Sequence, residues 1–111
     1  MVRRAFLIHA KPGMAGEYER RHKPVWPEME AALLEHGVKN YSIFLHEATG
    51  ALFGYLEIED EALFNRIGES EVCQNWWKYM KEVLVSESED SHMAKEELLK
   101  EVFNLRQMNQ K

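Results

Sequence analysis

Two β-rich runs stand close together in the middle of this 111-residue chain. They cover Val38–His46 and 52–58, and the segment between them, EATGA, contains a glycine and has the length of a hairpin connection. The two runs therefore predict a pair of antiparallel strands joined by a hairpin. The rest of the chain has to be arranged around this pair.

A strand and a kinked helical region precede the hairpin. Residues 2–9 form a compact apolar run that ends at the breaker residues KPG. Apolar and aromatic residues then recur every three to four positions over 14–36, which is the period of a helix. Two prolines interrupt this pattern, so we expect the helix to break just before Pro24 and a second segment to begin at Pro27.

A second helix and a last strand follow the hairpin. Asp60 is suited to cap this helix, and residues 61–85 carry an apolar face of helical period. The stretch SESEDS has no apolar residue and predicts an exposed loop. KEVFNL, residues 100–105, is the last plausible strand, and residues 106–111 form a polar tail.

The predicted order of elements is strand, helix, strand, strand, helix, strand. This βαββαβ order is the ferredoxin-like pattern of the α+β class, an antiparallel sheet with helices on one face, and the length fits one such domain over 1–111. Side chains alternate between the two faces of a strand, so one helical layer cannot cover all the large apolar residues of these strands. The residues concerned are Phe6, Ile8, Phe44, Phe53 and Tyr55. A second copy packed sheet against sheet would bury the surplus, and we therefore expect a homodimer.

The charge and the apolar runs of the chain exclude several classes of partner. Fourteen Lys and Arg against nineteen Asp and Glu leave a formal net charge of −5, which gives no overall positive field for nucleic acid. No apolar run reaches the roughly 18 residues of a membrane span, and the N-terminal run is too short for a signal peptide. The single cysteine, Cys73, cannot form an intramolecular disulfide, which fits a reducing compartment. We expect a cytoplasmic protein with no nucleic-acid or membrane partner.

The chain lacks the common motifs for metal and nucleotide chemistry. Its five histidines show none of the spacings of a metal site, and neither a glycine-rich phosphate loop nor a GxSxG motif is present. No metal or other cofactor is therefore expected.

Tyr18 and His22 are the first notable pair, because residues four apart project from one face of a helix. Histidine has an unperturbed pKa of about 6.5, which suits proton exchange near neutral pH, and a tyrosine can orient a hydroxyl group or a water beside it. Spacing alone favours a structural interpretation, in which Tyr18 is partly buried and His22 caps the helix before Pro24.

The segment EVCQNWWKYM places Trp76 and Trp77 side by side on the second helix. Neighbouring helical residues diverge by about 100°, so one indole can be core while the other lines a cavity. Flat aromatic faces pack against the C–H face of a sugar ring, which makes an indole beside polar groups a candidate sugar platform. The helical period by itself favours core packing for both, and most strand tyrosines such as Tyr41 and Tyr55 are structural.

Three blocks of the sequence, taken together, resemble the L-rhamnose mutarotase family. YERRHKPVWPE covers residues 18–28, NY is Asn40 and Tyr41, and WWKYM begins at Trp76. The resemblance runs through nearly the whole chain, from the first strand to EVFNL. The segment LVSESEDSHMAKEE differs in being acidic, where the family often has a Pro- and Asn-rich loop.

The resemblance implies a fold, an activity and a set of site residues. The implied fold is a dimeric α/β barrel of ferredoxin-like subunits. The implied activity is interconversion of the α and β anomers of L-rhamnose without a metal or organic cofactor. Carried over by position, His22 would be the proton donor, and Tyr18, Tyr41, Trp76 and Trp77 would bind the sugar.

The partner base and two competing functions stay open at this point. A tyrosine-bound water, Glu17 and Glu28 are weak candidates for the base that takes the anomeric proton. A cofactor-free or haem-linked monooxygenase can use the same barrel, since a fold alone does not fix a function. A sugar-binding module without catalysis would keep the aromatic residues but would not need His22 to titrate.

Overall fold

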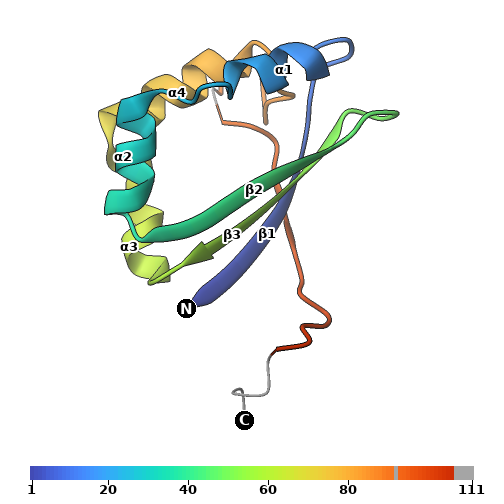
Figure 1. Ribbon diagram of the computed structural model, residues 1–111. Coiled ribbons are helices and arrows are strands. Elements are labelled where there is room, and N and C mark those ends of the chain that lie inside the picture. The colour runs from blue at the N-terminus through green and yellow to red at the C-terminus, as the bar shows by residue number, and fades with distance from the viewer. Residues whose placement is uncertain (92, 107–111) are drawn as a thin grey trace.

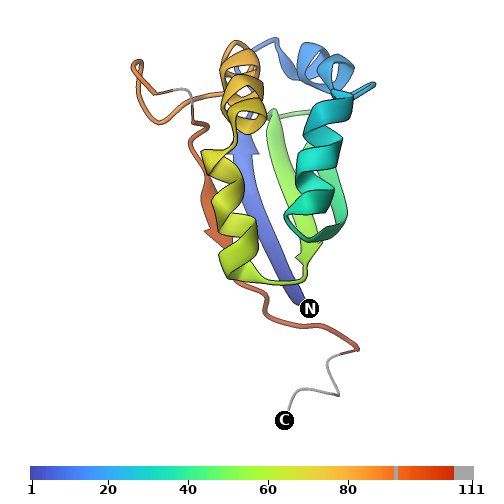
Figure 2. The same cartoon turned by 90° about the vertical axis from the view of Figure 1, so that its left-hand side faces the viewer.

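The computed structural model describes residues 1–91 and 93–106 of the chain. Its sheet is antiparallel with strand order β2-β3-β1-β4, and the helices all lie on one face of it (Figures 1 and 2). The strands are β1 Val2–His9, β2 Val38–His46, β3 Ala51–Ile58 and β4 Glu97–Leu99. The ferredoxin-like α+β fold is confirmed, with the predicted hairpin formed by β2 and β3 at one side of the sheet.

The kinked helical region is two helices, as the prolines predict. Helix α1 covers Ala15–Arg21 and helix α2 covers Pro27–Glu35, with Pro27 at the start of α2. Gly37 follows α2 with a φ of +84°, a left-handed conformation that glycine adopts without strain. The chain can therefore turn directly from α2 into β2.

The second helical region is shorter than the periodicity predicts. It consists of helix α3 Glu61–Asn65, a 3₁₀ turn η1 Arg66–Glu69 and helix α4 Glu71–Lys81. Asp60 caps α3 as expected, since its carboxylate accepts the Ala62 N–H at 2.9 Å. Among the described residues, no helix combines the length and apolar character needed to cross a membrane.

Helix α4 ends at Lys81, and the expectation that it continues to residue 85 is wrong. Beyond it the chain joins the end of β1: the Val83 carbonyl accepts the Lys11 N–H at 2.8 Å, and the Val85 N–H donates to the His9 carbonyl at 2.9 Å. Val83 is fully buried in this position. β-Branched residues fit an extended segment better than a helix, and here the backbone of β1 supplies the hydrogen bonds that a helix would have supplied.

The last strand also lies elsewhere than predicted. Strand β4 is Glu97–Leu99 and pairs with β1, whereas residues 100–106 leave the sheet as an extended arm (Figure 1). An ion pair between Arg3 Nε and Glu101 Oε2, at 2.8 Å, holds the base of this arm. Beyond it, Val102 and Phe103 are 86% and 70% exposed, because a single chain offers them no further strand. The predicted polar tail, 106–111, lies outside the described residues after Arg106.

Candidate functional site

A large cavity lies between the inner face of the sheet and the helices. Its volume is about 890 Å³, within the usual range of small-molecule sites. All five residues singled out by the family resemblance line it: Tyr18, His22, Tyr41, Trp76 and Trp77. Residues from α1, β2 and α4, far apart in the sequence, are thus brought to one cavity.

Tyr18 lies on α1, and His22 lies beside it at the C-terminal end of the same helix. Tyr18 is only 6% exposed, and the centroids of the two rings are 4.5 Å apart. His22 Nδ1 lies 3.0 Å from the Tyr18 backbone carbonyl. A carbonyl oxygen can only accept, so Nδ1 carries the hydrogen and donates it. Nε2 is then the ring nitrogen that remains for proton exchange.

The environment of His22 favours its neutral form. Burial lowers the pKa of His22 below its ordinary value of 6.5, and the hydrogen bond to the Tyr18 carbonyl opposes this shift in part. The imidazole therefore gives up its extra proton readily, which is a property of a proton-transfer group near neutral pH.

Trp76 forms the wall beside His22. The two rings meet edge to face with centroids 5.4 Å apart, and Trp76 is 8% exposed. Its indole also contacts Trp26 at 4.9 Å and Tyr79 at 5.7 Å between centroids. In the sequence, Trp26 and Tyr79 stood out only as letters of the motifs YERRHKPVWPE and WWKYM, because no spacing rule links residues of two helices that meet in space.

Trp77 lies on a different part of the same cavity wall. Its ring packs over Gly68 in η1, where a Cβ atom would stand 3.3 Å from Trp77 Cη2. Trp77 is half-buried and Trp76 is buried, and both line the cavity. The divergence of neighbouring helical residues therefore produces two walls here.

Tyr41 approaches the cavity from β2. Its ring meets the edge of Phe6 on β1, with centroids 6.2 Å apart. The residue is 37% exposed, since β2 is an edge strand. The phenol group is nevertheless desolvated, and this burial raises the pKa of Tyr41 strongly, with smaller contributions from Tyr18, Glu96 and Cys73. The hydroxyl group is therefore a neutral hydrogen-bonding group at ordinary pH.

The two carboxylates considered as bases from the sequence do not line the cavity. Glu17 accepts hydrogen bonds from Arg20 at 2.6 and 2.9 Å and from Arg21 at 2.7 Å. These bonds, from Arg21 first and Arg20 second, lower the pKa of Glu17. Glu28 is exposed on α2. A different carboxylate, Glu96, does line the cavity, and no motif in the sequence pointed to it.

Arg21 ties helix α1 to helix α4. Besides its bond to Glu17, it donates to the Tyr79 backbone carbonyl at 2.7 Å and pairs with Glu82 at 2.8 Å. Its guanidinium group also lies over the Tyr79 ring, 4.4 Å from the centroid. These contacts fix α1, and with it Tyr18 and His22, against the tryptophan wall.

The cavity also contains a buried thiol group. Cys73 is buried, and burial raises the pKa of its thiol to about 11, so it stays protonated and packs as a small apolar residue. Within the described residues, no group of three or more His, Cys, Asp and Glu side chains is placed to hold a metal ion.

The fold and the cavity define a small ferredoxin-like protein with an aromatic-walled site that contains a half-buried histidine. A sequence model of the L-rhamnose mutarotase family matches residues 3–105. The L-rhamnose mutarotase of Listeria monocytogenes serotype 4b is 49% identical over 105 residues, which are 95% of this chain and 99% of that protein. The chain belongs to the L-rhamnose mutarotase family, whose members are isomerases that interconvert sugar anomers.

Solved structures agree with this assignment. The crystal structure of L-rhamnose mutarotase from Formosa agariphila superimposes with a TM-score of 0.82 at 28% identity, over 95% of this chain and 99% of that one. A protein of Nitrosomonas europaea described as an antibiotic biosynthesis monooxygenase reaches a TM-score of 0.61 at 10% identity, over 92% of this chain and 100% of that one. The second likeness concerns the fold alone.

Proposed function

We propose that this protein interconverts the α and β anomers of L-rhamnose in the cavity, with His22 as a general acid and without a metal or organic cofactor. The observation that carries the proposal is the His22 ring, whose Nδ1 is occupied by the Tyr18 carbonyl inside a cavity that Trp76 and Tyr41 also line. This arrangement gives one oriented proton-transfer atom, Nε2, and aromatic surfaces against which a sugar ring packs.

The reaction requires only proton transfers and one reversible C–O cleavage. His22 gives a proton to the ring oxygen while a base takes the proton of the anomeric hydroxyl group. The bond between C1 and the ring oxygen breaks and leaves an open-chain aldehyde. Rotation about C1–C2 exposes the other carbonyl face, and closure by the reverse transfers gives the other anomer. General acid–base catalysis is typically worth about 10² to 10⁴ in rate, which suffices for a reaction that already proceeds in water.

The neutral residues of the wall are assigned to binding. Tyr18 and Tyr41 offer hydroxyl groups that stay protonated, because burial raises both pKa values. Such groups can donate to or accept from sugar hydroxyl groups. Trp76 and Trp77 supply flat apolar surface for the C–H face of the ring and for the 6-methyl group.

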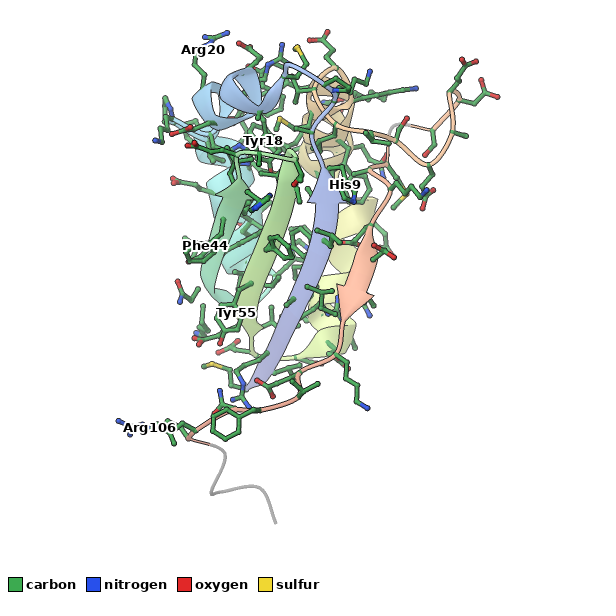
Figure 3. All side chains as sticks on the ribbon, turned by 90° about the vertical axis from the view of Figure 1, so that its right-hand side faces the viewer. His9, Tyr18, Arg20, Phe44, Tyr55 and Arg106 are labelled. Atoms are coloured by element: carbon green, nitrogen blue, oxygen red, sulfur yellow. The ribbon has the colours of Figure 1, made fainter. Side chains whose placement is uncertain are left out.

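The partner we propose for the protein is a second copy of the same chain. The outer face of the sheet carries no helix (Figure 3), and the register aligns Phe44, Phe53 and Leu7 in one row across it. Phe44 and Phe53 are 65% and 42% exposed. A face of this kind, with an apolar arm beside it, fits burial against an identical face in a two-fold dimer. Sedimentation should give the mass of two chains for the wild type, and Phe53→Glu should shift it toward one.

Exchange spectroscopy on L-rhamnose tests the activity. Saturation of one anomeric proton signal should spread to the other in the presence of wild-type protein, faster than in buffer. His22→Ala should abolish the added exchange while sugar binding, followed by tryptophan fluorescence, changes little.

Helix α2 offers a matched control for His22. His36 ends α2 as His22 ends α1, and its Nδ1 lies 2.8 Å from the Ala32 carbonyl, but it does not line the cavity. His36→Ala should leave exchange intact. Sugar binding without any accelerated exchange by the wild type would replace the mutarotase with a binding module. Absence of both binding and exchange, together with haem binding, would favour the monooxygenase.

A further inference from the structure

We propose that Glu96 is the second proton-transfer group of the site, the carboxylate that takes the anomeric proton while His22 protonates the ring oxygen. This inference rests on the proposed mutarotase activity and identifies the base that the sequence left open.

The strand register places Glu96 on the cavity side of the sheet. Glu97 pairs with Leu7, so Glu96 stands level with Ile8, a buried inward-facing residue of β1. Glu96 lines the cavity, as His22 and Tyr41 do. The segment before it is fixed, because the Lys95 N–H donates to the Val85 carbonyl at 2.9 Å. The carboxylate therefore has a defined backbone position next to the site.

Glu96 differs from the other carboxylates along the cavity. Glu96 and these three carboxylates are all exposed, but Glu19 is held by Lys23 Nζ at 2.7 Å, Glu30 lies on α2, and Glu47 lies in the turn between β2 and β3. Within the described residues, the carboxylate of Glu96 forms no hydrogen bond or ion pair, and it acts electrostatically on the Tyr41 hydroxyl group. Glu96 is thus close to Tyr41, a residue assigned to sugar binding, and no described side chain holds its carboxylate.

The surroundings of Glu96, and desolvation above all, bring its pKa toward that of His22. Desolvation raises the pKa of Glu96, Arg4 on β1 lowers it and Glu87 raises it further. Lys81 of α4 and Tyr41 of β2 line the same cavity. Because burial lowers the pKa of His22 and raises that of Glu96, the two values approach each other. A proton can then move in either direction at little cost, which a freely reversible anomerisation requires.

The cycle balances with one proton shared by the pair. In ring opening, the protonated form of His22, with hydrogen on both ring nitrogens, gives its Nε2 proton to the ring oxygen and becomes neutral. The C1–O bond breaks, and the Glu96 carboxylate removes the proton of the anomeric hydroxyl group as C1=O forms. After rotation, the C1–O bond re-forms on the other face, Glu96 returns its proton to the former carbonyl oxygen, and His22 recovers its proton from the ring oxygen. Both side chains end as they began.

The test is Glu96→Gln, which keeps size and removes the base. We expect exchange of L-rhamnose anomers to fall on the order of 10²-fold, a typical value for one proton-transfer group. The wild type should lose rate at low pH as Glu96 becomes protonated, and this loss should disappear in Glu96→Gln. Glu96→Asp should restore part of the rate together with the low-pH limb.

Glu97→Gln is the matched control, with the same change of charge one residue further on β4. Glu97 pairs with Leu7 on the outer face of the sheet. The Glu97→Gln variant should therefore exchange the anomers at the wild-type rate. Thermal unfolding of Glu96→Gln should match the wild type, which separates a catalytic loss from a folding defect. The inference is overturned if Glu96→Gln keeps a rate within about threefold of the wild type with its low-pH limb intact. Absence of exchange in the wild type would instead overturn the proposed function.

Discussion

The ring of Phe6 lies directly over Gly54 on the neighbouring strand. The two residues are partners in the β1–β3 register, and a Cβ atom at residue 54 would stand 2.1 Å from Phe6 Cζ. Real Cβ atoms essentially never come so close to another heavy atom. The missing side chain of Gly54 therefore fixes where Phe6 lies and, through the edge contact of that ring, where Tyr41 lies.

Gly54→Ala should destabilise the fold. The added methyl group forces the Phe6 ring out of its position, and overpacking of this kind typically costs about 1–3 kcal/mol. Urea unfolding should show this loss, and Phe6→Leu in the same chain should relieve part of it. Gly16→Ala is the control, because a Cβ atom there meets nothing within 4 Å. Equal stability of Gly54→Ala and the wild type would mean that the ring moves freely.

Arg21→Leu should loosen α1 from α4. It removes the bonds to the Tyr79 carbonyl and Glu82 and leaves Glu17 without its more buried partner, so the urea midpoint should fall. Arg20→Leu removes an ion pair with the same Glu17, but the Arg20 side chain is 73% exposed against 12% for Arg21. Its effect on the urea midpoint should be much smaller. A comparable loss from both variants would contradict the bracing role of Arg21.

The stability of the protein should decrease as the pH is lowered, because His22 becomes protonated. Its pKa is lowered in the folded state, so the unfolded chain, near pKa 6.5, binds a proton more readily. The stability that the folded state has while His22 is neutral is fully present above about pH 6.5. It is lost as the pH drops through the pKa of His22 in the folded state. Urea unfolding at pH 7.5 and 5.5 should therefore show a smaller pH effect for His22→Ala. A pH dependence in His22→Ala identical to that of the wild type would refute the assignment.

Lys81 should restrain the acidic loop that follows α4. Its Nζ donates to the Glu89 carbonyl at 2.5 Å, across the loop that contains Ser86 and Ser88. Lys81→Met removes this donor, and a protease specific for glutamate should then cleave at Glu87 and Glu89 several times faster. Lys78→Met, on the exposed side of α4, should be cleaved at the wild-type rate. Unchanged cleavage of Lys81→Met would show that the loop is held by other contacts.

The order of elements was predictable because each depends on local chemistry. The hairpin, the break before Pro27 and the cap at Asp60 follow from residues within a few positions of each other, and the structure confirms them. The end of α4 and the place of β4 depend on hydrogen bonds to β1 and the residues just after it, which lie far earlier in the chain. No local pattern contains that information, so both boundaries were predicted wrongly.

The residues of the candidate site also fall into those that local sequence patterns predict and those that they do not. Tyr18 and His22 were a visible pair because they share one helix, and the tryptophans were visible because they are adjacent. The family resemblance added Tyr41. Trp26, Arg21 and Glu96 were missed, since their places around the cavity depend on contacts between segments that are far apart in the sequence. Whether the five predicted residues act as proposed stays a prediction for the exchange experiments.

The cavity occupies the place between sheet and helices where most small domains have packed core. A ligand that fills it therefore acts on the folding equilibrium as well as on the chemistry. At a concentration of about 100 times its dissociation constant, such a ligand adds roughly 2.7 kcal/mol to the free energy of unfolding. The empty protein has the smallest margin against unfolding and proteolysis, so its lifetime is coupled to the supply of the sugar it binds.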